Sequence, residues 1–286
     1  MNGARVIVAV TLRECLRRRV LAVVALLTVA FLALYAAATH LAFATLSSAR
    51  VVQAGALVDS HALAGATLLG LAMFATLFLG AVLAVFLTFN VVRGDAEQGL
   101  LQPVVVRPIG RTAFVAARYG AACGICSAYV ALVYGGAVVI TGLEGGWWPD
   151  SIVLPGLALA GGVCIVAAIS LLGSVYLSTI PNGIAVLMVY GAGLVCGLLG
   201  QIGYALPSKR LENIGRDASY VLPFDALYQA GLHSLTANTS GFTGVIVHLG
   251  PLGGAQGSGP GLVVWAGVYV AAVLAATAAG LARRDL

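Results

Sequence analysis

The chain has 286 residues, of which 60% are hydrophobic and only 9% are charged, and its mean hydropathy is +1.02. Soluble domains carry about 25% charged residues, so this composition excludes a large soluble core and indicates a polytopic membrane protein. The formal net charge of +5 does not indicate nucleic-acid binding, because the charges lie at the ends of apolar runs, where orientation in a bilayer explains them.

The N-terminal segment is basic, and we expect residues 1–19 to form a helix along the membrane surface. A simple positive anchor for the first span is the alternative. A cleavable signal peptide is a third interpretation, because Arg17-Arg18-Arg19 precedes an apolar run and then Ala36-Ala37-Ala38. The run is long for a signal peptide, which favours an uncleaved first span.

Six apolar stretches are long enough to cross the hydrocarbon of a bilayer, which takes about 20 residues in a helix. Since backbone polar groups in lipid must pair within the protein, the sequence predicts an all-α fold, a single transmembrane domain over residues 1–286. The predicted spans are Val20–Phe43, Ala62–Phe89, Thr112–Ile140, Ile152–Thr179, Gly183–Leu206 and Gly261–Ala282.

The fourth and fifth spans are separated only by Ile180-Pro181-Asn182, where we expect a tight turn, because proline stops a helix. Glycines recur along three spans, and small residues let helices approach closely. Packing within one chain is the first interpretation of these glycines, and a contact with a second copy is the alternative. They are Gly120 and Gly124 in the third span, Gly156, Gly161 and Gly162 in the fourth, and Gly193, Gly197 and Gly200 in the fifth.

The basic residues fall mostly on one side of the predicted spans. Eleven of the 15 lie in the N-terminal segment, in the loop after the second span with the start of the third, and at the C-terminus. The positive-inside rule therefore places both termini in the cytoplasm. Residues 207–260 then form an exterior loop, in which Arg210–Ile214 and Asp225–Leu235 are expected to be short helices at the outer surface.

The most distinctive segment is the loop between the second and third spans, residues 90–111, which the charge pattern places in the cytoplasm. Asp95 and Gln98 can cap a short helix, and Pro103 would end it. Arg107-Pro108 and Gly110-Arg111 then turn the chain back toward the membrane. A short helix tied to two spans could transmit a push from a partner; an ordinary basic loop fits the residues equally well.

The chain resembles the membrane subunits of ABC type-2 export permeases. The resemblance rests on Glu97-x-Gly99-x-Leu101, then Arg107-Pro108-x-x-Arg111, then Arg118. Leu100 replaces the family's usual Thr, while Pro103 fits the subgroup that includes the permease of nitrous-oxide-reductase maturation. Agreement in outline extends to Thr11–Glu14, to the Pro181–Gly183 turn, to Pro223–Tyr228 and to the terminal Arg283–Leu286.

The resemblance implies a non-catalytic permease subunit of an ATP-driven exporter with six helices per chain. Its partners would be a second permease copy, expected to be identical, and two ATP-binding subunits that carry the ATP and Mg. Membrane lipids surround it, and we expect a multi-pass location in the plasma membrane of a bacterium. The coupling surface for the ATPase would contain Asp95, Glu97, Gly99, Leu100, Leu101, Arg107, Pro108 and Arg111.

Signs of chemistry on this chain itself are few. No phosphate-binding G-x-x-x-x-G-K-[ST] motif occurs, so any ATPase is a separate polypeptide. Cys123 and Cys126 have C-x-x-C spacing but lie inside an apolar run, which favours a structural role over a redox or metal site. We expect no catalytic residues, no metal site and no cofactor. A stand-alone carrier or channel and a non-transporting scaffold remain the alternatives, although the predicted spans lack the acidic residue that ion-coupled carriers usually keep.

Overall fold

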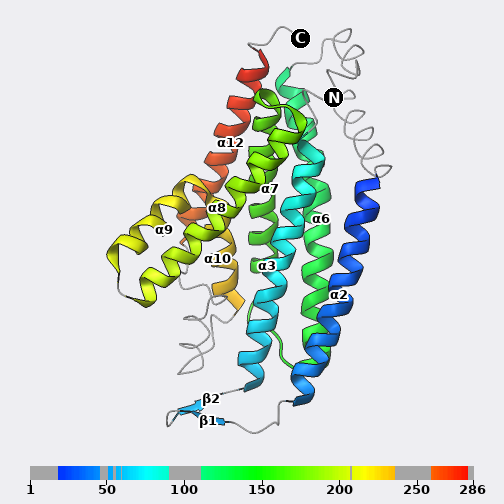
Figure 1. Ribbon diagram of the computed structural model, residues 1–286, viewed down its shortest axis with the longest axis vertical. Coiled ribbons are helices and arrows are strands. Elements are labelled where there is room, and N and C mark those ends of the chain that lie inside the picture. Colours follow the sequence, from blue (N-terminus) through cyan, green and yellow to red (C-terminus); the bar gives the residue numbers. More distant parts are fainter. Residues whose placement is uncertain are drawn as a thin grey trace.

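The computed structural model describes residues 19–45, 51–53, 56–58, 60–89, 111–206, 208–235 and 259–282. Six long helices dominate these residues: α2 (Arg19–Thr45), α3 (Ser60–Thr88), α6 (Arg111–Gly145), α7 (Val153–Tyr176), α8 (Thr179–Ala205) and α12 (Pro260–Ala282) (Figure 1). Two shorter helices, α9 (Lys209–Val221) and α10 (Pro223–Leu235), lie between α8 and α12. Strands β1 (Val51–Gln53) and β2 (Ala56–Val58) form an antiparallel hairpin between α2 and α3.

The prediction of six helical crossings is confirmed, because all six long helices are long and apolar enough to span a membrane. Their bounds follow the predicted spans within a few residues, except that α6 runs past Ile140 to Gly145. Gly146, with a φ of 62°, ends α6 in the left-handed conformation that suits glycine after a helix. The long helices alternate in direction, so the bundle has a loop end, where α3 ends and α6 begins, and a hairpin end, where the β1–β2 hairpin lies (Figure 1).

The predicted turn at Ile180–Asn182 is wrong by about three residues. The chain reverses at Leu177 and Ser178, which are the non-helical residues between α7 and α8, and Pro181 lies in the first turn of α8. Proline is tolerated there because the first N–H groups of a helix have no intrahelical acceptor, so its missing N–H costs nothing. The proline therefore starts the fifth span rather than stopping the fourth.

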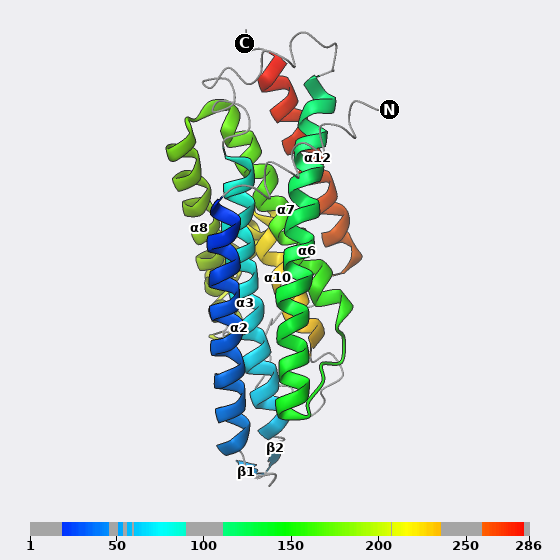
Figure 2. The same cartoon turned by 90° about the vertical axis from the view of Figure 1, so that its right-hand side faces the viewer.

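Helices α3 and α7 form the centre of the bundle, and α2, α6, α8 and α12 surround them (Figures 1 and 2). Their central faces meet in one apolar cluster that includes Leu69, Met73 and Leu77 of α3 and Leu159 and Val163 of α7, all fully buried. The outer helices instead expose large apolar side chains such as Leu26, Leu34 and Val264. Such a surface is suited to lipid, because lipid tails are as apolar as leucine.

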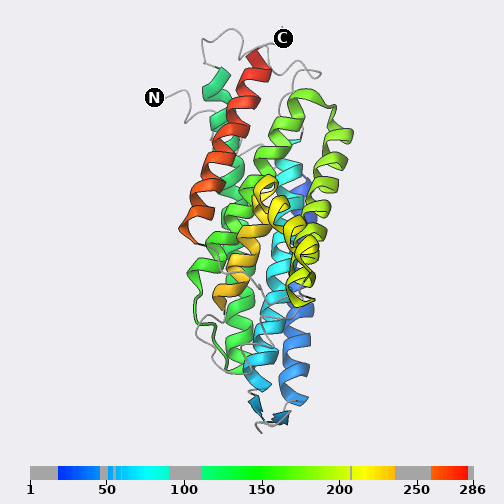
Figure 3. The same ribbon diagram turned by 90° about the vertical axis from the view of Figure 1, so that its left-hand side faces the viewer.

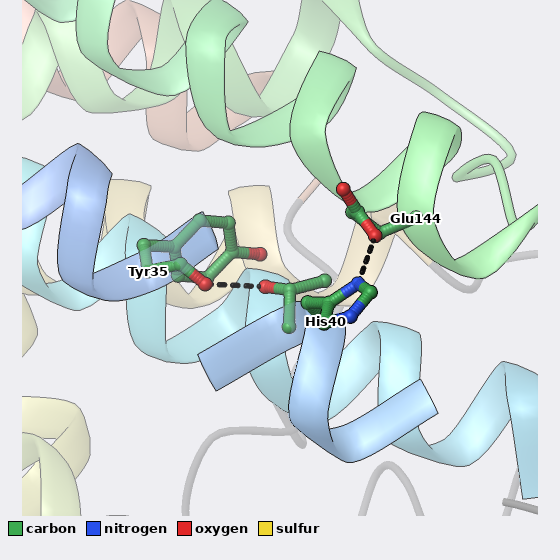
Figure 4. Close-up of polar contacts among 4 residues, drawn as sticks. Tyr35, His40 and Glu144 are labelled. Carbon is green, nitrogen blue, oxygen red and sulfur yellow. Dashed lines mark hydrogen bonds and ion pairs between the residues drawn. The ribbon is translucent and has the colours of Figure 1, made fainter. Parts of the chain in front are cut away.

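Several threonine hydroxyl groups inside the bundle are hydrogen-bonded within their own helix. Thr28, Thr39 and Thr76 each donate to the carbonyl four residues earlier on their own helix, at 2.7 Å. Between helices, the hydroxyls of Tyr35 on α2 and Thr141 on α6 lie 2.6 Å apart (Figure 4). These bonds hold α2 against α6 without placing an unpaired polar group in lipid.

The hairpin end carries polar and aromatic contacts. His40 Nδ1 lies 2.8 Å from Glu144 Oε2 at the exposed ends of α2 and α6 (Figure 4). The two tryptophans after α6 pack where side chains are missing: Trp147 lies against Gly65 of α3, and Trp148 lies against Gly142 of α6. Tryptophan is typical of the membrane–water interface, so these contacts mark this end of the bundle as an interface.

The predicted exterior loop contains more structure than expected. The sequence placed two short helices at the outer surface, whereas α9 is antiparallel to α8 and α10 packs against α7 inside the bundle. Figure 3 shows α9 and α10 meeting in an inverted V that lies against the long helices. Most of α10 is buried, including Phe224, Leu227 and Leu232. The outer-surface assignment is therefore wrong for α10. It is apolar enough to pack inward, and glycines on α7 and α8 leave room for it.

Candidate functional site

The predicted coupling residues fall almost entirely outside the described residues. Asp95, Glu97, Gly99, Leu100, Leu101, Arg107 and Pro108 lie in residues 90–110, and the short helix predicted there stays a prediction. Arg111 is the first residue of α6. The structure does describe the two helices that flank this segment. Helix α3, which ends at Thr88, packs against α6. The segment therefore joins two helices that are held together.

A buried asparagine ties the end of α3 to two other helices. Asn182, in the first turn of α8, is fully buried, and its Nδ2 donates to the carbonyl of Ser170 on α7 at 3.0 Å and to that of Phe89 at 3.5 Å. Gly173 of α7 leaves the space that the Asn182 amide occupies. The loop end thus contains a polar junction of α3, α7 and α8, directly beside the start of residues 90–110. We refer to it as the Asn182 junction.

The start of α6 is anchored by an apolar cluster at the same end. Phe114 and Val115 pack with Leu171 and Val175 of α7 and with Leu281 of α12. One turn further along α6, the Arg118 guanidinium carbon lies 5.7 Å from the centre of the Phe114 ring, a cation–π distance. Arg118, the basic residue of the sequence pattern, therefore packs against this apolar cluster.

Three glycines of α8 allow residues of α9 and α10 to pack closely against this helix. A side chain at Gly193 would clash with the Phe224 ring, one at Gly197 with the Asp225 carboxyl group, and one at Gly200 with the backbone of Gly215. Packing within the chain is thus confirmed for this stripe. The described residues show no such packing for Gly120 and Gly124 of α6, where a side chain would meet no described atom within 4 Å.

These contacts fix the depth of Asp225. Its neighbour Gly197 lies eight residues before the end of α8, while Gly162, which contacts Phe224, lies nine residues after the start of α7. At 1.5 Å per residue, Asp225 is about 12–14 Å from the hairpin-side ends of both helices. Asp225 therefore lies within the length of α7 and α8 and not at their ends.

Asp225 lines a cavity of about 550 Å³ between α8, α9, α10 and α12. Asp225 as a whole residue is 6% exposed, and its carboxyl is hydrogen-bonded by Gln229, one turn later on α10. Gln229 also accepts a hydrogen bond from Gln201 Nε2 of α8. Polar groups of three residues on two helices thus line the inner side of the cavity.

Burial is the main influence on the acidity of Asp225. Loss of hydration disfavours the carboxylate and raises its pKa from 3.8 to about 7, while the hydrogen bond from Gln229 opposes this rise. Burial, with the nearby charge of Asp225, also raises the pKa of Tyr228 on α10. A carboxyl that titrates near neutral pH can accept a proton or pair with a cation under physiological conditions.

Sequence reasoning missed this site because it assigned Asp225 to an exterior loop. The signal was available in the composition of Pro223–Leu235, which contains one acidic residue, one histidine and no lysine or arginine. A segment so poor in charge is suited to burial. Among the six long helices, Glu144 at the exposed end of α6 is the acidic residue, whereas α10 places Asp225 in a buried position beside α7 and α8.

The cysteines of the C-x-x-C spacing lie on α6 and face α7. Cys126 is fully buried in the main apolar cluster, and Cys123 forms a side-chain hydrogen bond with Cys164 of α7. The described cysteines Cys123, Cys126, Cys164 and Cys196 are free thiols. Within the described ranges, no three histidine, cysteine or acidic side chains gather as metal ligands would.

Comparison with protein-family models and with curated proteins gives no match to this chain. What the structure itself shows is a multi-pass helical protein, and its six apolar helices are compatible with membrane transport. Two regions are candidates for function: the loop end, with the Asn182 junction beside residues 90–110, and the Asp225 cavity.

Proposed function

We propose that this chain is the membrane-spanning permease subunit of an ATP-driven exporter of the ABC type-2 class. The observation that carries the proposal is the sequence pattern from Glu97 to Arg118, which begins between α3 and α6 and ends inside α6; these two helices pack against each other. The six apolar helices are compatible with a transport protein of this kind. The family assignment itself rests on the sequence resemblance.

In this proposal, residues 90–110 dock on a separate ATP-binding subunit. Leu100 and Leu101 fill an apolar groove of the ATPase, and Gly99 allows close backbone approach. Glu97 and the arginines Arg107 and Arg111 orient the segment by charge-assisted hydrogen bonds. Both termini and this segment then lie in the cytoplasm, as the distribution of basic residues predicts.

The Asn182 junction supplies a physical route for coupling. Residues 90–110 follow Phe89 directly, and the Phe89 carbonyl is bonded to the same amide that bonds α7. A displacement of the docked segment would therefore act on α3, α7 and α8 together. Transmission of this kind requires a contiguous packed network, which the buried amide provides.

A second permease copy completes the proposed transporter. Gly120 and Gly124 form an exposed, small-residue surface on α6 that no described part of the chain covers. Small residues at this spacing allow close helix–helix contact in membranes. We propose that this face contributes to a homodimer, with the cargo passing between the two copies.

The decisive experiment is Leu101→Asp with Leu252→Asp as its control. Leu252 is in the predicted exterior loop, so the control adds the same charge on the other side of the membrane. We expect Leu101→Asp to leave the chain folded in membranes but to abolish co-purification of an ATPase and ATP-dependent export. Leu252→Asp should retain both. Full transport by Leu101→Asp, or by the reconstituted chain without any ATPase, would overturn the proposal.

One observation favours a second candidate function, an ion-coupled carrier. Carriers of this class keep an ionisable group among their membrane helices, and Asp225 is a buried carboxyl packed against α8 of the bundle. Transport by the isolated chain in liposomes, driven by a pH gradient and lost in Asp225→Asn, would support this candidate. Transport that needs ATP and ignores the pH gradient would exclude it.

A further inference from the structure

The Asp225 cavity is rich in hydrogen-bond acceptors. The Asp225 carboxylate accepts only, and Gln201 Oε1 is buried with no partner among the described residues. The Gln201 amide nitrogen already donates to Gln229, whose own amide hydrogen-bonds Asp225. A buried acceptor without a donor destabilises the folded protein. A ligand that donates N–H groups to Gln201 Oε1 and to the Asp225 carboxylate would remove this destabilisation.

The cavity also lacks a positive charge beside Asp225. The described residues place no lysine, arginine or histidine in an ion pair with its carboxylate. Arg216 of α9 lines the same cavity, but its Nη2 donates to Asn213 Oδ1 at 2.6 Å, and both residues are exposed. Arg216 thus lies at the rim, held by its own helix. A cation bound deeper would meet the carboxylate first.

Two aromatic side chains, from α9 and α12, also contribute to the cavity. Trp265 of α12 donates its indole N–H to the Tyr220 carbonyl of α9 at 3.0 Å, and the two rings meet edge to face with centroids 6.4 Å apart. Both rings line the cavity. The hydrogen bond fixes the indole, whose face attracts cations, and an apolar ligand body can pack on the same surface.

We propose that the cavity between α8, α9, α10 and α12 binds a primary ammonium group attached to an apolar body. Asp225 is the counter-ion, Gln201 Oε1 accepts a second N–H, and Trp265 with Tyr220 holds the body. The size agrees, since about 550 Å³ lies within the roughly 300–1,000 Å³ of small-molecule sites and is far larger than a bare metal ion needs. The ligand is either a soluble amphiphilic amine or the ethanolamine headgroup of a phospholipid, which share this chemistry.

Ligand binding at this site depends on the protonation of Asp225. The groups that face it are the hydroxyls of Tyr190 on α8 and Tyr228 on α10, the amides of Gln201 and Gln229, and Arg216 on α9. None of these gains or loses a proton between pH 5.5 and 8 at ordinary values. Asp225 alone changes charge in that window, and its carboxylate, present at higher pH, is the form that attracts an ammonium group.

The test uses the purified full chain in detergent, with tryptophan fluorescence during thermal unfolding. The probes are 2-phenylethylamine, with 2-phenylethanol as its uncharged analogue, and dihexanoyl phosphatidylethanolamine, with the phosphatidylcholine analogue that lacks N–H donors. The variant is Asp225→Asn, and the control is Asp217→Asn, which removes an exposed carboxylate of α9 outside the cavity. No ATPase is present, so the result is independent of the proposed function.

At pH 8 we expect an amine to raise the unfolding temperature of the wild type and of Asp217→Asn by about 3 °C at saturating concentration. Asp225→Asn should show no shift, and the wild-type affinity should fall roughly tenfold or more at pH 5.5. A shift from 2-phenylethylamine alone identifies a soluble amine, and one from the ethanolamine lipid alone identifies a headgroup. The proposal is overturned if neither amine gives a shift, if 2-phenylethanol, the phosphatidylcholine analogue or sodium chloride shifts the protein equally, or if the shift survives in Asp225→Asn.

Discussion

Two helices of this protein carry glycines at the same four-residue spacing, and the structure treats them in opposite ways. On α8, Gly193 and Gly197 are covered by Phe224 and Asp225 of α10, whereas on α6 a side chain at Gly120 or Gly124 would meet no described atom within 4 Å. The spacing permits close approach but does not say what approaches. The difference comes from α10, which packs inward and fills one stripe with its own side chains.

The largest expected effect concerns the Asp225 carboxyl group, which packs against Gly197 of the covered glycine stripe on α8. Because the folded-state pKa of Asp225 is raised from 3.8 to about 7, the folded protein keeps a proton that the unfolded chain has lost between these values. Stability should therefore fall by about 4 kcal/mol as pH rises from 4 to 7 and stay level above 7. Asp225→Asn should lack this decline, so parallel pH profiles of thermal unfolding for the two proteins would contradict the assignment.

A bulky side chain should distinguish the two stripes directly. Gly197→Leu would place a side chain where the Asp225 carboxyl lies, and we expect a loss of about 3 kcal/mol with displacement of α10. Gly124→Leu makes the same change on the open stripe and should alter the stability of the single chain by less than about 0.5 kcal/mol. Thermal unfolding in detergent measures the stability of both variants, and equal losses of stability would contradict the difference between the two glycine stripes.

The smallest effect on stability is expected for substitutions that disrupt a dimer of two copies of the chain. If the open stripe is a contact between two copies, Gly120→Leu with Gly124→Leu should lower the dimer fraction in mild detergent about tenfold, with the unfolding temperature unchanged. Gly135→Leu on the same helix is the control, because a side chain there also meets no described atom but lies about four turns further along. Equal dimer fractions for all three proteins would count against the α6 face.

Much of the fold follows from the sequence because apolar length is a strong signal in membrane proteins. The six spans were located within a few residues, since a run such as Val153–Tyr176 has no soluble interpretation. The turn at Leu177 and Ser178 was misplaced because Pro181 both stops and starts helices, and spacing alone does not separate these roles. The hairpin β1–β2 was not predicted, because three-residue strands leave no periodicity to read.

The functional regions were harder to predict for different reasons. The inward position of Asp225 depends on Gly162 and Gly197, which are 28–63 residues away in sequence, so no local pattern around Asp225 reveals it. The Asn182 junction likewise depends on Phe89 and Ser170. The predicted coupling residues from Asp95 to Pro108 remain a prediction from sequence alone.

The buried amide of Asn182 has a mechanical consequence for the distant cavity. Asn182 and Gly197 lie on one continuous helix, 15 residues or about 22 Å apart. With the amide as a pivot, α8 acts as a lever, and a tilt of only about 5° would carry the Gly197 backbone about 2 Å. Because Asp225 lies directly against that glycine, a small rotation of α8 at the loop end would either compress the packing around the carboxyl group or loosen it.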